Sequence, residues 1–513
     1  MSMKKEFEHI SPDKFTFVQL DDHLHDKKLD TKSRSFLQDA FLRFRKNKSS
    51  VVAAWILIAL VLFALISPLL SPYTMDDKDN TFKAYPSYVP SIAKLELGIM
   101  DGSTVFKNQN EKSMLYWKGI ATETGMDPVL KVIDTESTWV KKRGQMVEVL
   151  TYNLKINRYY ETGMVYRKYS VEDFEKLLKW QDETGIQVVY PYVETKDISD
   201  LKDSPNLWYK VDSSGKAILD DDGNFQPVYS TRQEIAGYEY DSLRIKGDDG
   251  SYIYSRQIDG ALEVRVCYYN LYQYINGVEP TYILGTTASG QDLFSAIGIG
   301  ARFSLIFAIV VSVINLAIGA CYGAIQGYYG GSIDMVLDRI TDILSGVPFI
   351  VVATLFQKHL VATGKVSDVA GFLFAFVLTG WIGMAALTRK QFYRFKSQEF
   401  VMAARTLGAS DGRLIIKHIF PNAIGTMITS CALVIPSAIS SETSMAYLGI
   451  VNLQKQAGAT IGSLLSEGNA SFTAAPHVMI WPSLFLGLLM ICFNLFGNGL
   501  RDAFNPSTRG AED

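Results

Sequence analysis

Long apolar runs alternate with polar segments along this chain and predict six membrane-spanning helices. Residues 51–70 are uncharged and reach the length that an α-helix needs to cross a bilayer. This run is too long for the apolar part of a signal peptide, and no small-residue cleavage site follows, so we expect an uncleaved anchor. Further runs predict five more spans, at 303–326, 345–363, 370–388, 422–450 and 477–498. The 345–363 run is the weakest because Lys358 interrupts it.

The segment between the first two spans, residues 72–283, has a different pattern and predicts a separate inserted domain. Turn signals built from Asp, Ser, Gly and Asn recur in it, at 212–217, 220–224 and 247–251. Residues 250–258 and 261–275 alternate apolar and polar positions, which predicts hairpin strands. One helix is expected at 171–183, behind a capping box at 170–173. The predicted domain is α+β and mainly β.

The inserted domain shows no recognisable catalytic pattern. It contains no histidine, no G-x-S-x-G motif and no carboxylate pair set apart by its spacing. The acidic turn at 220–224 lacks the spaced ligands and distal glutamate of a calcium loop, so a solvated hairpin turn is the better interpretation. We therefore expect a binding or docking role, since a tyrosine-rich surface suits contacts with peptides or proteins.

Composition and charge argue against two further classes of function. The formal net charge of the 513 residues is −3, so no basic excess supports nucleic-acid binding. The four cysteines show neither pairing nor metal-ligand spacing, which indicates neither a disulfide framework nor a zinc site. We expect no cofactor or metal to be bound by this chain.

Lysine and arginine residues near the spans set the expected orientation. They gather before the first span and between the fourth and fifth, at Lys32, Arg34, Arg43, Arg45, Lys46, Lys48, Arg389, Lys390, Arg394, Lys396, Arg405, Arg413 and Lys417. Six spans place both groups on one side, which the positive-inside rule makes cytoplasmic. Both termini are then cytoplasmic, and residues 72–283 are extracellular.

The segment before the first span predicts an amphipathic helix at the inner membrane surface. Its apolar residues share one helical face, with cations elsewhere: Phe36, Leu37, Ala40, Phe41 and Phe44. A helix of this kind lies in the membrane interface, and a plain anchor is its expected role.

Residues inside the spans predict a packed bundle with one polar stretch. Gly319, Gly323 and Gly327 recur four apart on the second span, which lets a neighbouring helix approach to backbone distance. Glu442 is the clearest ionisable residue inside a span, and it needs protein or water beside it. Its stretch also holds a group of hydroxyl residues, Ser437, Ser440, Ser441, Thr443 and Ser444. Glu442 therefore either lines a pathway or makes a structural hydrogen bond.

Two polar segments between spans predict further short helices. Residues 328–348 suit an amphipathic helix at the cytoplasmic surface, and its charged face would be solvated: Asp334, Asp338, Arg339 and Asp342. Residues 397–407 suit a helix and 408–412 a turn, after which a second helix runs into the fifth span past Pro421. Glycine suits this turn because it accepts positive φ without strain. Such an elbow can pass the motion of a soluble partner into the spans.

The spacing of this elbow resembles the EAA loop of ABC-importer permeases. That pattern runs E-A-A, three residues, G, nine residues, then I-x-L-P. Here Ala403, Ala404, Gly408 and Pro421 match, whereas Met402 replaces the glutamate. The aliphatic positions are also replaced, and a glutamate lies one helical turn earlier. The chain has no G-x-x-x-x-G-K-[ST] motif, so another polypeptide must supply any ATP hydrolysis.

A second resemblance narrows the family to the C-type (OppC/DppC-like) permeases of oligopeptide and dipeptide importers. Residues 282–305 are similar to their segment before the second span. The matching positions are Leu284, Gly285, Thr286, Gly290, Asp292, Ser295, Gly300, Ala301, Arg302, Ser304 and Leu305, and the departures are Thr287, Gln291 and Ala296. Segments 327–334, 441–450 and 496–506 are also similar. The likeness covers about 31–85 and 282–506, and the usual family pattern does not explain the residues between.

The resemblance implies an all-α membrane domain with the type I ABC importer permease fold. The expected divisions are a cytoplasmic N-terminal tail with an amphipathic helix at 1–50, the first span at 51–71, an extracellular inserted domain at 72–283, a permease core at 284–506 with a coupling helix at about 397–413, and a cytoplasmic tail at 507–513. The inserted domain would be either a docking or peptide-handling platform or a purely structural cap.

The resemblance also implies partners and site residues. A B-type permease would complete the pathway, two ABC ATPases would bind ATP and Mg and hold the elbow, and an extracellular lipoprotein would deliver the peptide. Membrane lipid would surround the spans. The implied coupling residues are Glu399, Ala403, Ala404, Arg405, Leu407, Gly408, Ala409, Ser410, Asp411 and Arg413. Candidates for pathway lining or packing are Glu442, Ser437, Ser441, Gly319 and Gly323.

Two other hypotheses stay open from the residues alone. One is a signalling or scaffold protein whose outer domain senses a ligand while the spans anchor it. The other is an ion-coupled carrier that uses Glu442. Neither explains a helical elbow between the fourth and fifth spans.

Overall fold

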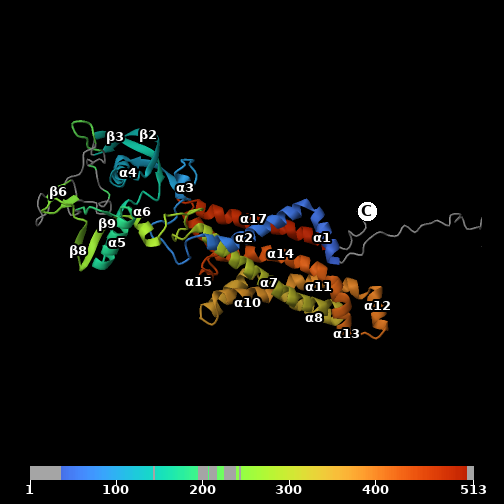
Figure 1. Cartoon of the computed structure of the whole chain (residues 1–513). Helices are drawn as coiled ribbons and strands as arrows, with labels where there is room; N and C mark the ends of the chain where they lie inside the picture. The colour runs from blue at the N-terminus through green and yellow to red at the C-terminus, as the bar shows by residue number, and fades with distance from the viewer. Residues whose placement is uncertain are drawn as a thin grey trace, which may run out of the picture.

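The protein consists of a bundle of long helices that carries an α+β unit at one end (Figure 1). The computed structural model describes residues 36–142, 145–193, 206, 209, 217–224, 239–241 and 244–504. The predicted cations Lys32 and Arg34, most of the turn at 212–217, the last residues of the segment 496–506 and the tail at 507–513 lie outside the described residues. We refer to the two ends of the bundle as the domain end, next to the α+β unit, and the elbow end.

Five segments of the bundle are long and apolar enough to cross a membrane. They are α2 (Lys48–Leu70), α7 (Leu293–Tyr329), Asp368–Lys396, Asp411–Tyr447 and α17 (His477–Phe504). The third contains α10 (Asp368–Thr379) and α11 (Ile382–Lys396), and the fourth contains α14 (Phe420–Tyr447). The chain is therefore a polytopic helical membrane protein.

The predicted span at 345–363 is one arm of a bent helix pair. It comprises α9 (Phe349–Phe356) and the π-helical η3 (Gln357–Val361), and it meets α8 (Gly331–Ser345) at 74°. The bend occurs where Gly346 ends one helix and Pro348 precedes the next, because proline cannot continue a helix from the preceding residues.

The bent pair carries the chain from one end of the bundle to the other. It begins at the elbow end, where Lys396 Nζ lies 2.9 Å from the carbonyl oxygen of Gly327. It is followed at the domain end by Asp368, whose carboxylate accepts a hydrogen bond of 3.3 Å from Gln456 of α15 (Gln454–Ala457). The next helices, α10 and α11, then return to the elbow end (Figure 1).

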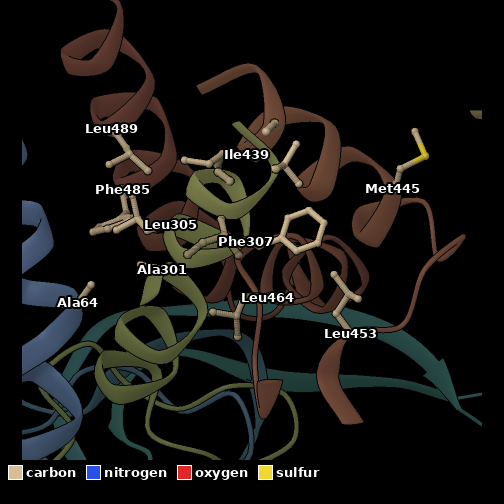
Figure 2. Packing of buried hydrophobic residues seen from close by; sticks show 14 of the residues in the cluster. Ala64, Ala301, Leu305, Phe307, Ile439, Met445, Leu453, Leu464, Phe485 and Leu489 are labelled. Carbon is tan, nitrogen blue, oxygen red and sulfur yellow. The ribbon is translucent and has the colours of Figure 1, made fainter. Parts of the chain in front are cut away.

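The core of the bundle lies where α2, α7, α14 and α17 meet α16 (Ile461–Ser471). Figure 2 shows Leu305 and Phe307 of α7 packed near Ile439 and Phe485. These side chains are buried, as expected where several apolar helices face one another rather than lipid.

α7 packs against α11 along the predicted glycine stripe. A Cβ placed on Gly319 would lie 2.7 Å from Met384 Cβ, and one on Gly323 would lie 2.3 Å from Ala385 O. Gly327 is equally close to α11, at 2.7 Å from a backbone oxygen. All three distances are well below carbon contact distances, so only glycine lets the two backbones touch.

The predicted helix before the first span is α1 (Phe36–Lys46), which lies against the end of α17. Ala40 is buried, and the Phe44 ring packs edge-on against Phe496 with 5.5 Å between centroids. Phe41 is exposed, as expected for a side chain that enters lipid. The side chains of Phe36 and Leu37 lie outside the described residues.

The α+β unit contains two main antiparallel sheets. The first has the strand order β1-β3-β2, with bounds β1 (Ser103–Asn110), β2 (Val129–Lys142) and β3 (Gln145–Asn157). The second has the order β4-β9-β5, with β8 also pairing with β9, and bounds β4 (Met164–Tyr169), β5 (Val189–Tyr190), β8 (Ser255–Ile258) and β9 (Ala261–Cys267). A short pair is formed by β6 (Glu239–Asp241) and β7 (Arg244–Lys246). Helices α3 (Pro90–Ala93), α4 (Glu111–Thr124), α5 (Val171–Thr184) and α6 (Tyr268–Asn276) complete the described part.

Local sequence signals account for α5, whereas α6 replaces part of a predicted strand. The Ser170 hydroxyl accepts a hydrogen bond from the Asp173 N–H at 3.1 Å, and Leu177 is fully buried, so the predicted helix is confirmed. The predicted strand at 261–275 is wrong after Cys267, where the chain turns into α6. The buried Tyr268, Tyr269, Leu271 and Tyr272 recur at helical spacing, and tertiary burial therefore overrides their preference for strands.

An aromatic base joins the α+β unit to the bundle. We use this name for Tyr73, Phe82, Tyr85, Tyr88, Tyr159, Tyr268, Tyr269, Tyr272 and Tyr282, all of which are buried. Tyr73, just after α2, stacks on Tyr282, which precedes α7, with 4.7 Å between ring centroids. Tyr88 and Tyr282 exchange two backbone hydrogen bonds of 2.9 and 2.7 Å. The unit is therefore packed onto the bundle and not tethered by loose linkers.

Candidate functional site

The predicted elbow is present at the end of the bundle away from the α+β unit. It consists of α12 (Glu399–Thr406), α13 (Asp411–Arg413) and the π-helical η4 (Leu414–Ile419), which continues into α14 (Figure 1). Gly408 has a φ of +84°, and its N–H donates to the carbonyl of Arg405 at 2.9 Å. The left-handed conformation at Gly408 ends α12, as is common for a glycine that follows a helix.

The inner face of the elbow is held on the bundle by apolar packing. Val401, Leu414 and Ile419 are fully buried, and Ala404 and Ala409 pack partly buried beside them. The same cluster contains Tyr328 of α7 and Phe392 of α11. Apolar packing therefore attaches the elbow to the bundle, which a lever requires.

The outer face of the elbow exposes large apolar side chains. Leu407 is 89% exposed at the tip, and Ile416, Met402 and Phe400 are exposed around it. The remaining exposed coupling candidates are Glu399, Ala403, Gly408, Ser410 and Arg413. Exposed apolar groups framed by charged residues mark an interaction surface, and we call this set the elbow tip.

Arg405 and Asp411 are exposed but are both bound to the bundle through one residue that the sequence did not single out. The Tyr328 hydroxyl accepts a hydrogen bond from Arg405 Nη2 at 3.2 Å and donates one to Asp411 Oδ1. In the sequence, the segment 327–334 is only a family-like motif, and no spacing rule connects it to Arg405 and Asp411, some 80 positions later. This contact could not be derived without the fold.

A second polar cluster at the elbow end corrects the prediction for residues 328–348. Asp334 is buried, and Arg389 of α11 pairs with it at 2.7 Å and with Asp338 at 2.9 Å. Both acids therefore bind α11, and Asp334 does not belong to a solvated face, whereas the Asp338 side chain stays 40% exposed. Only Arg339 and Asp342 match that expectation, since they are exposed and pair with each other.

Glu442 and its hydroxyl neighbours divide into an inner and an outer group. Glu442 is fully buried, and the Ser304 hydroxyl of α7 donates to Glu442 Oε2 at 2.7 Å. This placement favours the structural hydrogen bond over the pathway-lining role. Ser437 is exposed and Ser441 half-buried, and together with the exposed Ser440 and Ser444 they form a polar stripe along α14.

The described residues contain no group of three or more His, Cys, Asp or Glu residues placed to hold a metal. In the acidic turn at 220–224, the Asp220 carboxylate accepts hydrogen bonds from the N–H groups of Asp222 and Asn224, at 3.1 and 2.8 Å. This arrangement is a side-chain-capped turn, as expected for a solvated hairpin end.

Comparisons with known proteins identify the relatives of the bundle. Residues 319–510 match the family described as binding-protein-dependent transport system inner membrane component. Residues 35–88 match the N-terminal TM domain of oligopeptide transport permease C. Most of the α+β unit lies between these two matches.

Individual relatives agree with these matches. The oligopeptide transport system permease protein OppC of Haemophilus influenzae is 36% identical over 240 residues, covering 45% of this chain and 72% of the relative. The dipeptide transport system permease protein DppC of Lactococcus lactis is 37% identical over 233 residues, covering 45% and 65%. A solved structure of the inward-facing MetNI methionine ABC transporter is 14% identical and covers 41% of this chain with a TM-score of 0.34, which is too low to support an inference.

Proposed function

Because this chain belongs to the family of binding-protein-dependent transport system inner membrane components, we propose that it is the C-type permease subunit of an ABC importer that carries peptides. Its relatives are named as oligopeptide and dipeptide transport permeases. In this role the chain is a non-catalytic subunit, and ATP with its Mg is bound by separate ATPase subunits.

The observation that carries the proposal is the elbow tip. Leu407 and its apolar neighbours are presented to an outside partner, while Val401, Leu414 and Ile419 fix the same elbow to the bundle. A partner that moves on ATP binding would pull on the exposed side and move the helices attached to the buried side. We therefore propose that the elbow docks into an ATPase subunit and carries its motion to α7, α11 and α14.

We propose six membrane passages, with the bent pair α8 and α9–η3 as one of them. The elbow end is rich in cations, which include Arg394, Lys396, Arg413 and Lys417, so the positive-inside rule favours a cytoplasmic elbow. The α+β unit at the opposite end would then be extracellular, and α1 would lie in the inner leaflet. Both chain ends are proposed to be cytoplasmic.

We propose that the serine stripe of α14 faces the translocation pathway that this chain forms with a B-type permease. Ser437, Ser440 and Ser444 are exposed on an otherwise apolar span. Lipid tails offer hydroxyl groups on this face no hydrogen-bond partner, whereas water and a peptide backbone can hydrogen-bond to them. Glu442 lies behind the stripe and supports it through the contact with α7.

The test of this proposal is reconstitution with the expected partners. The chain, a B-type permease, two ABC ATPases and the binding lipoprotein should together give ATP-dependent peptide uptake in proteoliposomes. Crosslinks placed along residues 399–413 should trap an ATPase. A stable solitary protein without bound ATPase would favour a sensor or scaffold, and uptake that follows the proton gradient without ATP would favour an ion-coupled carrier.

We further propose that the α+β unit is the docking platform for the extracellular peptide-binding lipoprotein. It projects from the end of the bundle at which peptide would arrive (Figure 1). Its β2–β3 hairpin exposes Trp139 and Met146. Large exposed apolar and aromatic side chains are the groups that anchor protein interfaces.

Removing the α+β unit should lower binding-protein-dependent uptake at least about tenfold, which corresponds to about 1.4 kcal/mol of lost docking energy. Tyr88 and Tyr282 form an isolated antiparallel pair with two backbone hydrogen bonds, so an Asn-Gly turn can replace residues 89–281 between them. Uptake and ATPase co-purification should be measured together. Retained ATPase binding controls for folding, and normal uptake by the shortened protein would show that the unit is only a structural cap.

A further inference from the structure

One tyrosine hydroxyl at the elbow end of α7 connects the two arms of the elbow. Tyr328 lies in the last turn of α7, and Arg405 and Asp411 lie on opposite sides of the turn at Gly408. Arg405 donates to the Tyr328 hydroxyl at 3.2 Å, and the hydroxyl donates to Asp411. In the part of the chain that the structure describes, Arg405 and Asp411 form no direct ion pair, so the tyrosine is the bridge between them.

The position of this hydroxyl is fixed by packing. Only 7% of Tyr328 is exposed, and its ring belongs to the apolar cluster that contains Val401 and Leu414. The Arg405 guanidinium also lies 5.8 Å from the centre of the Tyr328 ring, within the range of a cation–π contact. A hydroxyl that is held on a buried ring and bonded to two charged groups gives a stiff connection, because charge-assisted hydrogen bonds are stronger than neutral ones.

α11 is attached to the same end of α7. Lys396 Nζ donates to the carbonyl oxygens of Gly327 and Tyr328, at 2.9 and 3.4 Å. A cation at this position complements the negative end of the helix dipole. The end of α7 therefore binds α11, α12 and α13. At its other end, α7 begins after Asp292, whose carboxylate accepts a hydrogen bond of 2.7 Å from Ser71, just after α2.

We infer that Tyr328 is a positioning residue for coupling, and that its hydroxyl makes the two arms of the elbow and the end of α7 move as one body. The inference rests on the proposed function. Without the hydroxyl the ring would still pack, but the arms could turn about Gly408 relative to α7. Movement of the ATPase would then be absorbed at the elbow before it reached the bundle.

The experiment compares Tyr328→Phe with the wild-type chain in the complete importer, reconstituted with its partner permease, two ATPases and the binding protein. Uptake of a radiolabelled alanine tetrapeptide and ATP hydrolysis are measured on the same proteoliposomes. We expect hydrolysis to continue while the peptide imported per ATP falls about tenfold, the change that the loss of a hydrogen bond to a charged group can cause. Asp411→Ala removes the acceptor and should behave like Tyr328→Phe, whereas Asp411→Asn keeps a weaker, neutral acceptor and should give a ratio between those of Tyr328→Phe and the wild type.

The matched control is Tyr329→Phe. Tyr329 is 50% exposed and contacts the Tyr328 ring at 5.2 Å, and it has no assigned part in the elbow. It should leave the ratio of peptide to ATP unchanged. An unchanged ratio in Tyr328→Phe, or a parallel fall in hydrolysis, uptake and assembled complex, would overturn the inference. A wild-type importer without ATP-dependent uptake would instead overturn the proposed function, and this inference with it.

Discussion

Replacing Gly408 by proline should abolish ATP-driven peptide uptake while the protein still reaches the membrane. Gly408 has a φ of +84° and donates its N–H to Arg405 at 2.9 Å. Proline fixes φ near −65° and has no N–H, so it removes both features at once. The exit angle of α12 would change, and the elbow tip would no longer fit the ATPase subunit on which we propose that it docks. Uptake and peptide-stimulated ATP hydrolysis in proteoliposomes are the measurements.

Substitution by alanine separates the effect of backbone conformation from the effect of side-chain size at this position. A Cβ on Gly408 meets no atom within 4 Å, so Gly408→Ala tests only the cost of positive φ, about 1–2 kcal/mol. Gly383 of α11 has equally open surroundings without positive φ, and Gly383→Ala is the matched control. We expect an intermediate loss of coupling for Gly408→Ala and none for Gly383→Ala. Full coupling in Gly408→Pro would contradict the proposal that the elbow acts as a lever.

Replacing Gly323 by leucine should prevent the bundle from folding. The Cβ of any residue there would lie 2.3 Å from Ala385 O and 2.7 Å from Thr388 Cβ, so α7 and α11 would have to separate. Overpacking by a single methyl group commonly costs about 1–3 kcal/mol, and leucine adds several carbons at a backbone contact. We expect Gly323→Ala to lower the thermal unfolding midpoint and Gly323→Leu to leave little folded protein in membranes.

The comparison for this prediction is Gly487→Leu in α17. Gly487 also lies in an apolar span, but a Cβ there meets no atom within 4 Å. The same change in hydrophobicity should therefore be tolerated, as judged by membrane yield and by size-exclusion profile in detergent. Equal yields of the Gly323 and Gly487 variants would show that α7 and α11 are not in backbone contact.

Features encoded by local sequence could be predicted with few errors. Long apolar runs predict the spans, because bilayer thickness sets a length that composition alone can meet. The elbow followed from a glycine between two helical patterns, and α5 followed from the Ser170 cap. For the elbow and α5 the determining residues lie close together in the chain, and each span is set by one continuous run of residues.

Features that depend on distant contacts could not be predicted. The pairing of Arg389 with Asp334 and Asp338 joins helices that are separated in sequence, so Asp334 looked solvent-exposed when its own helix was considered alone. The same holds for the Tyr328 bridge and for α6, where burial in the aromatic base overrides the strand preference of tyrosine. The bend between α8 and α9 could not be predicted either, since a hydropathy run does not report the angle between its parts.

The aromatic base makes the α+β unit a stiff extension of α2 and α7. Tyr73 and Tyr282 stack at the root of this extension, and Tyr88 pairs with Tyr282 through two backbone hydrogen bonds. A small tilt of α7 would therefore produce a larger displacement at the far strands of the unit, because displacement grows with distance from the axis of rotation. A protein resting on those strands would be displaced in step with that tilt. Fluorophores on the β2–β3 hairpin would thus give an optical reading of the movement of α7.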